Sequence, residues 1–323
     1  MKKSKKIKLL VLIILLLISF ILLFYELLFS EKNKSYQISV IASGKSDESF
    51  MILKEGAEQA ALEMNANIRF LFLSKDNNEE EQIELIKRES ENAVDALLIS
   101  PIESEVVEEV IEEAEKKIPI ILIQSLLNVK SDIKRVVCDE YQLGKSLAEG
   151  ALSNVSKDTA VMVITNDNNS TSNNERYRGI IEKLDEVDSN YFISDIKNYI
   201  DYTILGNEIK LNNIGVIICV DRNITEKVAE LKKKITSEGS SSDNVLIFGV
   251  GNTNKIISLL EEEIVNATAV QNEFNIGYIA VKNAIELKNG EKVEDVKMIK
   301  STVIASEDMY SPKNERILFQ FVR

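Results

Sequence analysis

A short polar loop, Gly44–Glu48, holds the first residue suited to chemistry with a small molecule. The loop follows Ile38, Val40 and Ile41, whose spacing predicts a buried strand, and it precedes a stretch with helical periodicity. In open α/β sheets, ligands bind beside the loops at the carboxyl ends of strands. The carboxylate of Asp47 in this loop could therefore accept hydrogen bonds from two hydroxyl groups of a bound molecule.

The sequence lacks the motifs of the common catalytic sites. It has no histidine, which excludes His-based acid–base catalysis, Ser-His and Cys-His nucleophile pairs and most catalytic zinc sites. Gly44–Ser46 and Gly144–Ser146 mimic the end of a phosphate-binding loop, but Ser39 and Asp139 stand where that loop requires an earlier glycine. No pair of carboxylates stands out for glycoside hydrolysis. We therefore predict no catalytic residue, no metal site, no cofactor and no enzymatic activity.

Length and composition indicate a folded protein, with two compact domains or one large one. Hydrophobic residues make up 45% of the 323 residues, enough for sizeable cores. The net charge is −13, and residues 1–34 carry seven Lys and two Glu, which leaves −18 for the remainder. So acidic a domain argues against a nucleic-acid partner, because binding phosphates requires a basic face. Cys138 and Cys219 each fall at a predicted strand, and we interpret both as buried free thiols.

The N-terminus predicts a membrane anchor. Leu9–Tyr25 is apolar except for Ser19, and five lysines precede it, so residues 1–8 should stay in the cytoplasm and the rest should be exported. We predict a retained transmembrane helix over residues 9–29 and a linker over 30–35, which places a binding domain outside the cytoplasm at the cell membrane. A cleaved signal peptide is the alternative, although no small-residue cleavage site follows the apolar run.

Predicted strands and helices alternate along the rest of the chain, which indicates doubly wound α/β units. Apolar, β-branched runs predict strands at residues 68–73, 96–100, 119–124, 136–138, 160–165, 191–196, 215–220, 245–249 and 267–270. Helical periodicity predicts helices at residues 77–92, 103–117, 174–184, 199–212, 224–237, 254–262 and 276–288. The acidic faces of these helices are interpreted as solvated surface. Arg316–Phe321 has strand character and could add an edge strand.

Four segments resemble the ribose-binding-like type I periplasmic binding proteins, the binding components of sugar ABC transporters. They are LKEGAEQAA, IPIILIQ, ERYRGI and ATAVQNEFNIGYIAVKNAI, within a resemblance that covers roughly residues 36–307. The resemblance implies an α/β fold of two doubly wound, Rossmann-like lobes, here in a membrane-anchored and diverged form. Three hinge crossings are implied near 138–139, 271–272 and 301–304, with a late strand at the last. Lobe 1 would comprise residues 36–138 plus 272–303, and lobe 2 residues 139–271 plus 304–323.

The resemblance also implies a ligand cleft between the lobes, formed by loops at strand ends. Carried over position by position, the implied ligand-binding residues are Asp47, Phe50, Gln124, Ser125, Arg176, Tyr199, Asp221, Asn252 and Gln271. Phe50 and Tyr199 would be the stacking faces for a sugar ring, although Phe50 could instead begin the apolar face of its helix. Arg178 is the alternative to Arg176, two residues along.

The chain departs from the family pattern at two places. Gln124 and Ser125 stand where the ribose-type pattern has Asp and Arg, which replaces charged partners with an amide and a hydroxyl. Gly251 and Asn252 stand where many members have Asp. The predicted function is therefore an extracytoplasmic binding protein for a carbohydrate-like molecule, as a membrane-anchored receptor for a sensor such as a histidine kinase. The alternative is the substrate-binding component of a sugar-type ABC importer, acting with a permease, and an extracellular enzyme is the least favoured alternative.

Overall fold

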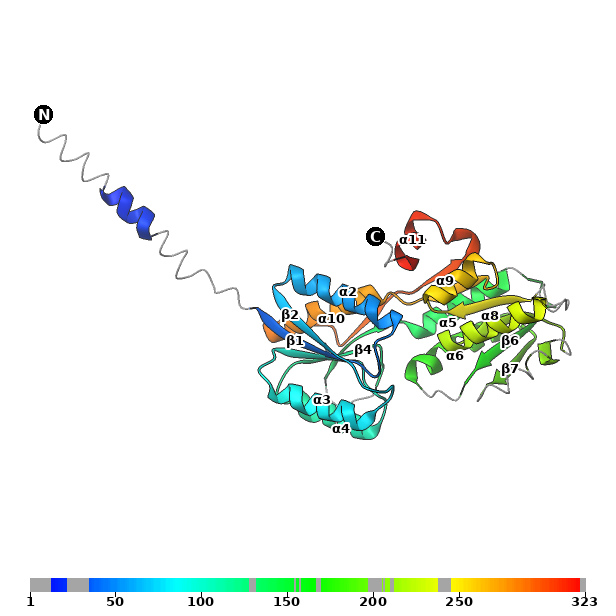
Figure 1. Cartoon of the computed structure of the whole chain (residues 1–323), viewed down its shortest axis with the longest axis horizontal. Helices are drawn as coiled ribbons and strands as arrows, with labels where there is room; N and C mark the ends of the chain where they lie inside the picture. Colours follow the sequence, from blue (N-terminus) through cyan, green and yellow to red (C-terminus); the bar gives the residue numbers. More distant parts are fainter. Residues whose placement is uncertain are drawn as a thin grey trace, which may run out of the picture.

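The structure is a computed structural model of the chain, and its described residues form two α/β lobes (Figure 1). The described residues are 13–21, 35–127, 132–153, 155–156, 158–166, 170–196, 205, 207–209, 212–237 and 245–319. Each lobe contains one six-stranded sheet. The two-lobed α/β fold with parallel sheets that the sequence predicts is therefore confirmed.

The sheet of lobe 1 is entirely parallel and has the strand order β11-β5-β4-β3-β1-β2. Its strands are β1 (Tyr36–Ile41), β2 (Ala66–Leu71), β3 (Ala96–Ile99), β4 (Ile120–Ile123), β5 (Lys134–Cys138) and β11 (Val296–Ile299). Its helices are α2 (Glu48–Glu63), α3 (Glu79–Glu91), α4 (Glu105–Glu115) and α10 (Glu273–Lys288). Figure 1 shows α2 and α10 on one face of the sheet and α3 and α4 on the other. Helices on both faces explain why β3 and β4 are apolar throughout.

The sheet of lobe 2 has the order β12-β10-β9-β8-β6-β7, and β12 is its antiparallel member. Its strands are β6 (Ala160–Thr165), β7 (Tyr191–Asp195), β8 (Ile214–Cys219), β9 (Leu246–Val250), β10 (Ala267–Val270) and β12 (Thr302–Ala305). Its helices are α5 (Glu140–Ser153), α6 (Thr171–Glu186), α8 (Arg222–Ser237), α9 (Asn254–Glu261) and α11 (Pro312–Leu318), with the short 3-10 helix η1 (Ser306–Asp308). Cys219 lies in β8 and Cys138 in β5, and both are buried free thiols, as expected.

The chain passes between the lobes after β5, after β10 and after β11. At the third passage the sequence predicted one late strand near residues 301–304 and a lobe boundary after residue 303. The structure instead has β11 in the first sheet and β12 in the second, so that boundary falls inside β12. The strands of both sheets end at the region between the lobes. A chain that continues straight across must therefore enter the second sheet in reverse, which explains why β12 is antiparallel.

The two ends of the chain bear on two further predictions. Arg316–Leu318 lies in α11, which begins at Pro312, so the predicted edge strand at the C-terminal tail is wrong. Proline is well suited to the first turn of a helix, where its missing N–H is not needed.

Of the predicted anchor, residues 13–21 are described and form a helix with exposed apolar side chains. Within the described part of the chain, no helix combines the length and apolarity needed to cross a membrane.

Glycines bring two helices of lobe 1 into backbone contact. A Cβ atom on Gly56 of α2 would lie 1.9 Å from the carbonyl oxygen of Phe274 in α10, and a Cβ on Gly277 would lie 2.0 Å from that of Leu53. Only glycine allows so close an approach, because the separation of packed helices depends on the side chains between them. The close packing of α2 on α10 brings Ser49 and Glu273, near the starts of these helices, within hydrogen-bonding distance.

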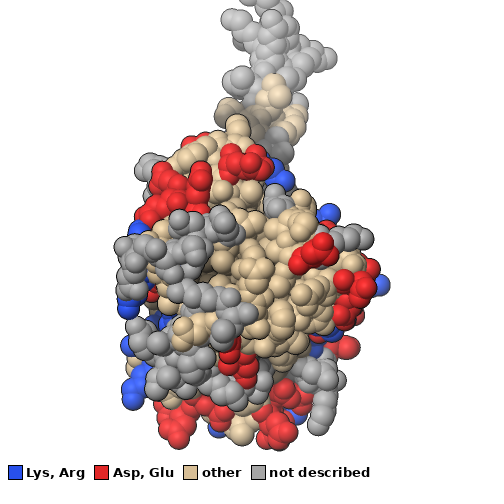
Figure 2. Space-filling model, turned by 90° about the vertical axis from the view of Figure 1, so that its right-hand side faces the viewer, with Lys and Arg blue, Asp and Glu red and all other residues tan. Residues whose placement is uncertain are grey.

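Figure 2 shows the end of lobe 2 that lies away from lobe 1. Acidic side chains gather along the rim of this face, and an uncharged area occupies its centre. Among the described residues visible there, lysine and arginine are scattered and form no broad basic surface.

Candidate ligand-binding site

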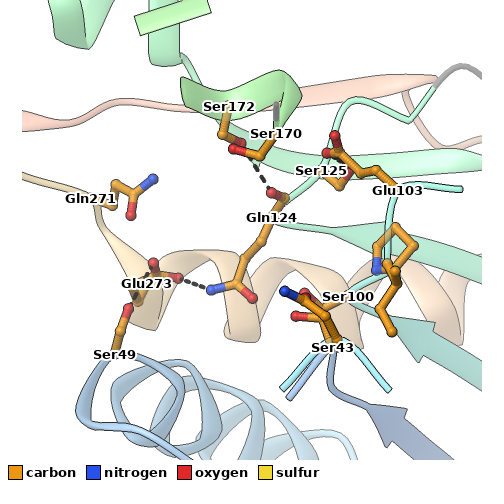
Figure 3. Close-up of a pocket in the computed structure, with 13 residues that line it drawn as sticks. Ser43, Ser49, Ser100, Glu103, Gln124, Ser125, Ser170, Ser172, Gln271 and Glu273 are labelled. Carbon is orange, nitrogen blue, oxygen red and sulfur yellow. Dashed lines mark hydrogen bonds between the residues drawn. The ribbon is translucent and has the colours of Figure 1, made fainter. Parts of the chain in front are cut away.

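A cavity of about 490 Å³ lies between the lobes, at the carboxyl ends of their strands. This volume is in the range of typical small-molecule sites. Its lining is polar for the most part and includes no aromatic residue among those described. The lining residues are Ser43, Ser49, Asn77, Ser100, Pro101, Ile102, Glu103, Gln124, Ser125, Ser170, Ser172, Gln271 and Glu273. Figure 3 shows that these side chains come from both lobes and from the passage after β10.

Glu273 is the most unusual residue of this cavity, because it is an acidic residue that is only 3% exposed. Ser49 Oγ donates a hydrogen bond to its Oε1 atom at 3.1 Å, and Gln124 Nε2 donates to its Oε2 atom at 2.9 Å (Figure 3). Burial, helped by the nearby carboxylates of Glu140 and Asp47, raises the pKa of Glu273 to about 7. The two hydrogen bonds lower the pKa in part. Glu273 therefore changes its charge near neutral pH.

Gln124 connects Glu273 to the other lobe. It follows β4 with a φ of 60°, a left-handed conformation that is uncommon for residues other than glycine. In this conformation its side-chain amide faces Glu273. Its backbone carbonyl oxygen accepts a hydrogen bond from Ser172 Oγ of lobe 2 at 3.2 Å. Strained backbone of this kind often occurs at ligand sites, where the surrounding structure holds it in place.

Glu103 forms a second connection between the lobes. It follows β3 in lobe 1, and its oxygens accept hydrogen bonds from the backbone N–H and the hydroxyl of Thr171, each at 2.7 Å. Thr171 is the first residue of α6 in lobe 2, so the carboxylate lies at the positive end of that helix. Ser125 Oγ donates a further hydrogen bond to Glu103 at 2.7 Å. The two contacts with Thr171 join the lobes and exist only when the lobes are close together.

Two acidic residues of α2 and its cap also contact lobe 2. Asp47 caps α2 through the backbone N–H of Phe50 and forms an ion pair with Arg222 at 2.8 Å. The neighbouring Glu48 accepts a hydrogen bond from the backbone N–H of Asn254, the first residue of α9, at 2.7 Å. Both Asp47 and Arg222 are partly exposed, so the ion pair contributes little to stability by itself. It places Asp47 in a contact between the lobes rather than at a ligand.

Arg176 is buried in an ion pair inside lobe 2. Its side chain donates to Oε2 of Glu140 at 2.6 and 3.0 Å, to Asn173 Oδ1 at 3.2 Å and to the carbonyl oxygen of Val220 at 2.5 Å. These contacts use four of its five N–H donors. The other oxygen of Glu140 accepts a hydrogen bond from Gln271 Nε2, which links the pair to the cavity lining. Arg176 therefore acts through Glu140 and Gln271 rather than lining the cavity itself.

The sequence model of the periplasmic binding protein domain matches residues 38–292. The chain belongs to this family. As a member, it is a binding protein and not an enzyme, in agreement with the prediction from its motifs. No protein of curated function matches the sequence significantly.

Solved structures of periplasmic binding proteins share the fold. GanP, a glucose-galactose binding protein from Geobacillus stearothermophilus, has a TM-score of 0.74 at 20% identity, with 86% of this chain and 99% of GanP covered. A carbohydrate transporter solute-binding protein from Agrobacterium radiobacter, in complex with D-arabinose, has a TM-score of 0.77 at 21% identity, covering 88% and 99%. A chain of the XylFII-LytSN complex has a TM-score of 0.71 at 22% identity, covering 85% and 99%.

The cavity of this periplasmic binding protein brings together three of the residues proposed from sequence, namely Gln124, Ser125 and Gln271. Asp47 and Arg176 lie outside its lining, in the ion pairs described above. Asp221 also lies outside the lining, where one oxygen caps α8 through the backbone N–H of Ile224 and the other accepts from Asn166, both at 2.8 Å. These acidic and basic side chains are thus occupied by protein partners.

The remaining residues proposed from sequence do not line the cavity. Phe50 is 6% exposed and packs edge-on against Phe70 and Phe72, with ring centroids 6.4 and 5.0 Å apart. Its predicted role as a stacking face is therefore wrong, and the alternative of a core residue is the correct one. Asn252 follows β9 and is half-buried outside the lining. Tyr199 lies outside the described residues.

Sequence reasoning missed most of the polar lining. Ser100 directly follows β3 and Ser43 lies two residues beyond β1, so a search of every predicted strand end would have identified them. Glu103 lies farther from its strand, in the loop between β3 and α4, and Glu273 is the first residue of α10. Glutamates in such positions usually face solvent, which is how the acidic helix residues were interpreted. For Glu273, its position two residues after Gln271 is the feature of the sequence that could have indicated a place in the cavity.

Proposed function

We propose that this protein is an extracytoplasmic receptor that closes its two lobes around a carbohydrate-like small molecule. The carrying observation is the polar cavity between the lobes, in which serine hydroxyls, amides and carboxylates from both lobes face one volume. Such groups suit a ligand with many hydroxyls, because each hydroxyl can both donate and accept a hydrogen bond. The bound sugars named for structures that share the fold support the same ligand class.

The contacts across the cavity supply a mechanism for closure. Glu103, Glu48 and Asp47 of lobe 1 bind partners on lobe 2 that opening of the hinge would separate. A ligand that contacts both lobes binds the closed state more tightly and shifts the population toward it. In a receptor, the closed arrangement presents a different outer surface to a partner protein, and this surface carries the signal.

For the partner, we propose a membrane sensor such as a histidine kinase. Two features support this choice: the basic flank and apolar run of residues 1–29, and the similarity in fold to a chain of the XylFII-LytSN complex. The alternative is delivery of the ligand to an ABC permease, which the carbohydrate transporter protein from Agrobacterium radiobacter favours. Capture of a kinase or of a permease by the ligand-bound protein separates these alternatives.

Ligand binding is tested by calorimetry and thermal shift on the full chain in mild detergent. We expect at least one pentose, hexose, amino sugar or polyol to raise the melting temperature. Gln271→Ala should weaken the binding of that ligand by about 1–3 kcal/mol, because it removes a hydrogen-bonding group from the cavity. Gln142→Ala, at an exposed position of α5, is the matched control and should bind normally. Absence of any shift across the whole panel would contradict the proposed ligand class.

Membrane attachment is a separate part of the proposal. We expect the full chain to remain in the membrane fraction after washing with alkaline carbonate, because an apolar segment of about 20 residues suffices to span the bilayer. Sequencing of the mature N-terminus provides the decisive measurement. A mature chain that begins near Ser30 or Ser35 would show that the segment is removed as a signal peptide.

A further inference from the structure

The charge of the cavity narrows the ligand class beyond a neutral sugar. Two carboxylates, Glu103 and Glu273, belong to the lining, and no lysine or arginine does among the residues that the structure describes. Arg176 and Arg222 lie outside the lining, and each is paired with a protein carboxylate, Arg176 with Glu140 and Arg222 with Asp47. The cavity therefore disfavours an anionic ligand and retains negative charge of its own.

The two lining carboxylates differ in how that charge is balanced. Glu103 accepts three hydrogen bonds, and one of them comes from a backbone N–H at the start of α6, where the helix dipole stabilises an anion. Among the described residues, Glu273 accepts only from the neutral groups of Ser49 and Gln124, and no cationic side chain of that part of the chain contacts it. A buried carboxylate without a cationic partner is costly, and the raised pKa of Glu273 reflects this cost. Of the two lining carboxylates, Glu273 is therefore the one whose charge is balanced neither by a cationic side chain nor by a backbone N–H among the described residues.

We infer that the ligand carries a protonated amine and that this ammonium group binds Glu273. The inference rests on the proposed function, because it assigns one functional group of the carbohydrate-like ligand. A carboxylate offers about four acceptor positions, and Ser49 and Gln124 occupy two, so Glu273 can still accept from an ammonium. Gln271 and the serines of the lining remain for the hydroxyls. An amino sugar has both kinds of group.

The amine should have a large effect on affinity. A charge-assisted hydrogen bond at a buried carboxylate is about twice as strong as a neutral one, and it also supplies the missing countercharge. We therefore expect an amino sugar to bind about 10- to 100-fold more tightly than the sugar with a hydroxyl at the same carbon. A sugar acid should bind more weakly than either, because its carboxylate would face Glu103 and Glu273.

The experiment compares matched ligands by calorimetry on the full chain in detergent at pH 7. The probes are D-glucosamine with D-glucose, D-galactosamine with D-galactose, and D-glucuronate. In at least one pair the amino sugar should bind at least 10-fold more tightly. Glu273→Gln keeps the shape of the side chain and should reduce this ratio to about one. Glu103→Gln is the matched control, since it should weaken both members of a pair alike and leave their ratio unchanged.

The other possible results of this experiment contradict either the inference about the amine or the proposed ligand class. If neutral hexoses bind as tightly as their amino counterparts, the inference is wrong while the proposed function stands. A ratio that disappears in Glu103→Gln but persists in Glu273→Gln would also overturn it, because the ammonium would then lie at the other carboxylate. If no sugar, amino sugar or polyol binds, the proposed ligand class fails and the inference fails with it. Melting curves without ligand confirm that both variants are folded.

Discussion

Replacing Arg176 with alanine should lower the melting temperature of the protein by about 10 °C, which corresponds to a loss of about 3–5 kcal/mol. The guanidinium group and its partner Glu140 are 4% exposed each, and both lie inside lobe 2. The substitution removes the cation and leaves the carboxylate of Glu140 buried with Gln271 as its remaining side-chain partner. It also leaves the carbonyl oxygen of Val220 without this donor. Thermal unfolding followed by circular dichroism provides the measurement.

The matched control is Arg178→Ala, two residues along the same helix. Arg178 is exposed, pairs with Glu175 and lies over the ring of Tyr141 at 4.3 Å, contacts worth about 1 kcal/mol together at most. We expect its melting temperature to stay within about 3 °C of the wild type. If Arg176→Ala instead melts normally and loses the ligand, Arg176 contacts the ligand directly and its structural role is wrong.

The fold could be predicted from sequence because it depends on patterns that repeat along the chain. Buried parallel strands such as β3 and β4 are apolar at every position, and this pattern does not depend on the sequences of the helices that cover them. The weaker edge strand β11 has the sequence VKMI with exposed positions, so its pattern did not distinguish it from a loop. Edge strands and short C-terminal helices depend on neighbours that lie far away in the sequence.

The site was predicted in part, because sequence indicates which side chains follow strands but not which partners they find. Gln124 and Gln271 follow β4 and β10 and do line the cavity. Arg176 and Asp221 occupy equally suitable positions, yet a glutamate and a helix N-terminus bind them. The burial of Glu273 could not be predicted, because it requires α2 and α10 to pack at the distance that Gly56 permits.

Replacing Glu273 with glutamine should remove a pH dependence of stability. The pKa of this carboxyl group rises from 4.5 to about 7 on folding, chiefly because burial penalises the charged form. Between these two values the folded protein holds a proton that the unfolded chain has released, so the stabilisation is complete below pH 4.5 and is lost as the pH rises through 7. A difference of this size corresponds to about 3 kcal/mol. Glutamine cannot ionise. The free energy of unfolding of the variant, relative to that of the wild type, should therefore rise by about 3 kcal/mol between pH 4.5 and pH 8.

Melting curves of both proteins from pH 4.5 to pH 8 provide the measurement, without ligand. Many other carboxylates titrate in the same interval, but they do so in both proteins, so the difference between the two curves isolates Glu273. The control is Glu113→Gln, which removes an exposed carboxylate that is paired with Lys116 and whose pKa is lowered. The stability of this variant relative to the wild type should not rise with pH. A flat difference for Glu273→Gln would mean that folding does not raise the pKa of this carboxyl group. Burial would then not penalise its charged form, and the binding of an amine at Glu273 would lose its physical basis.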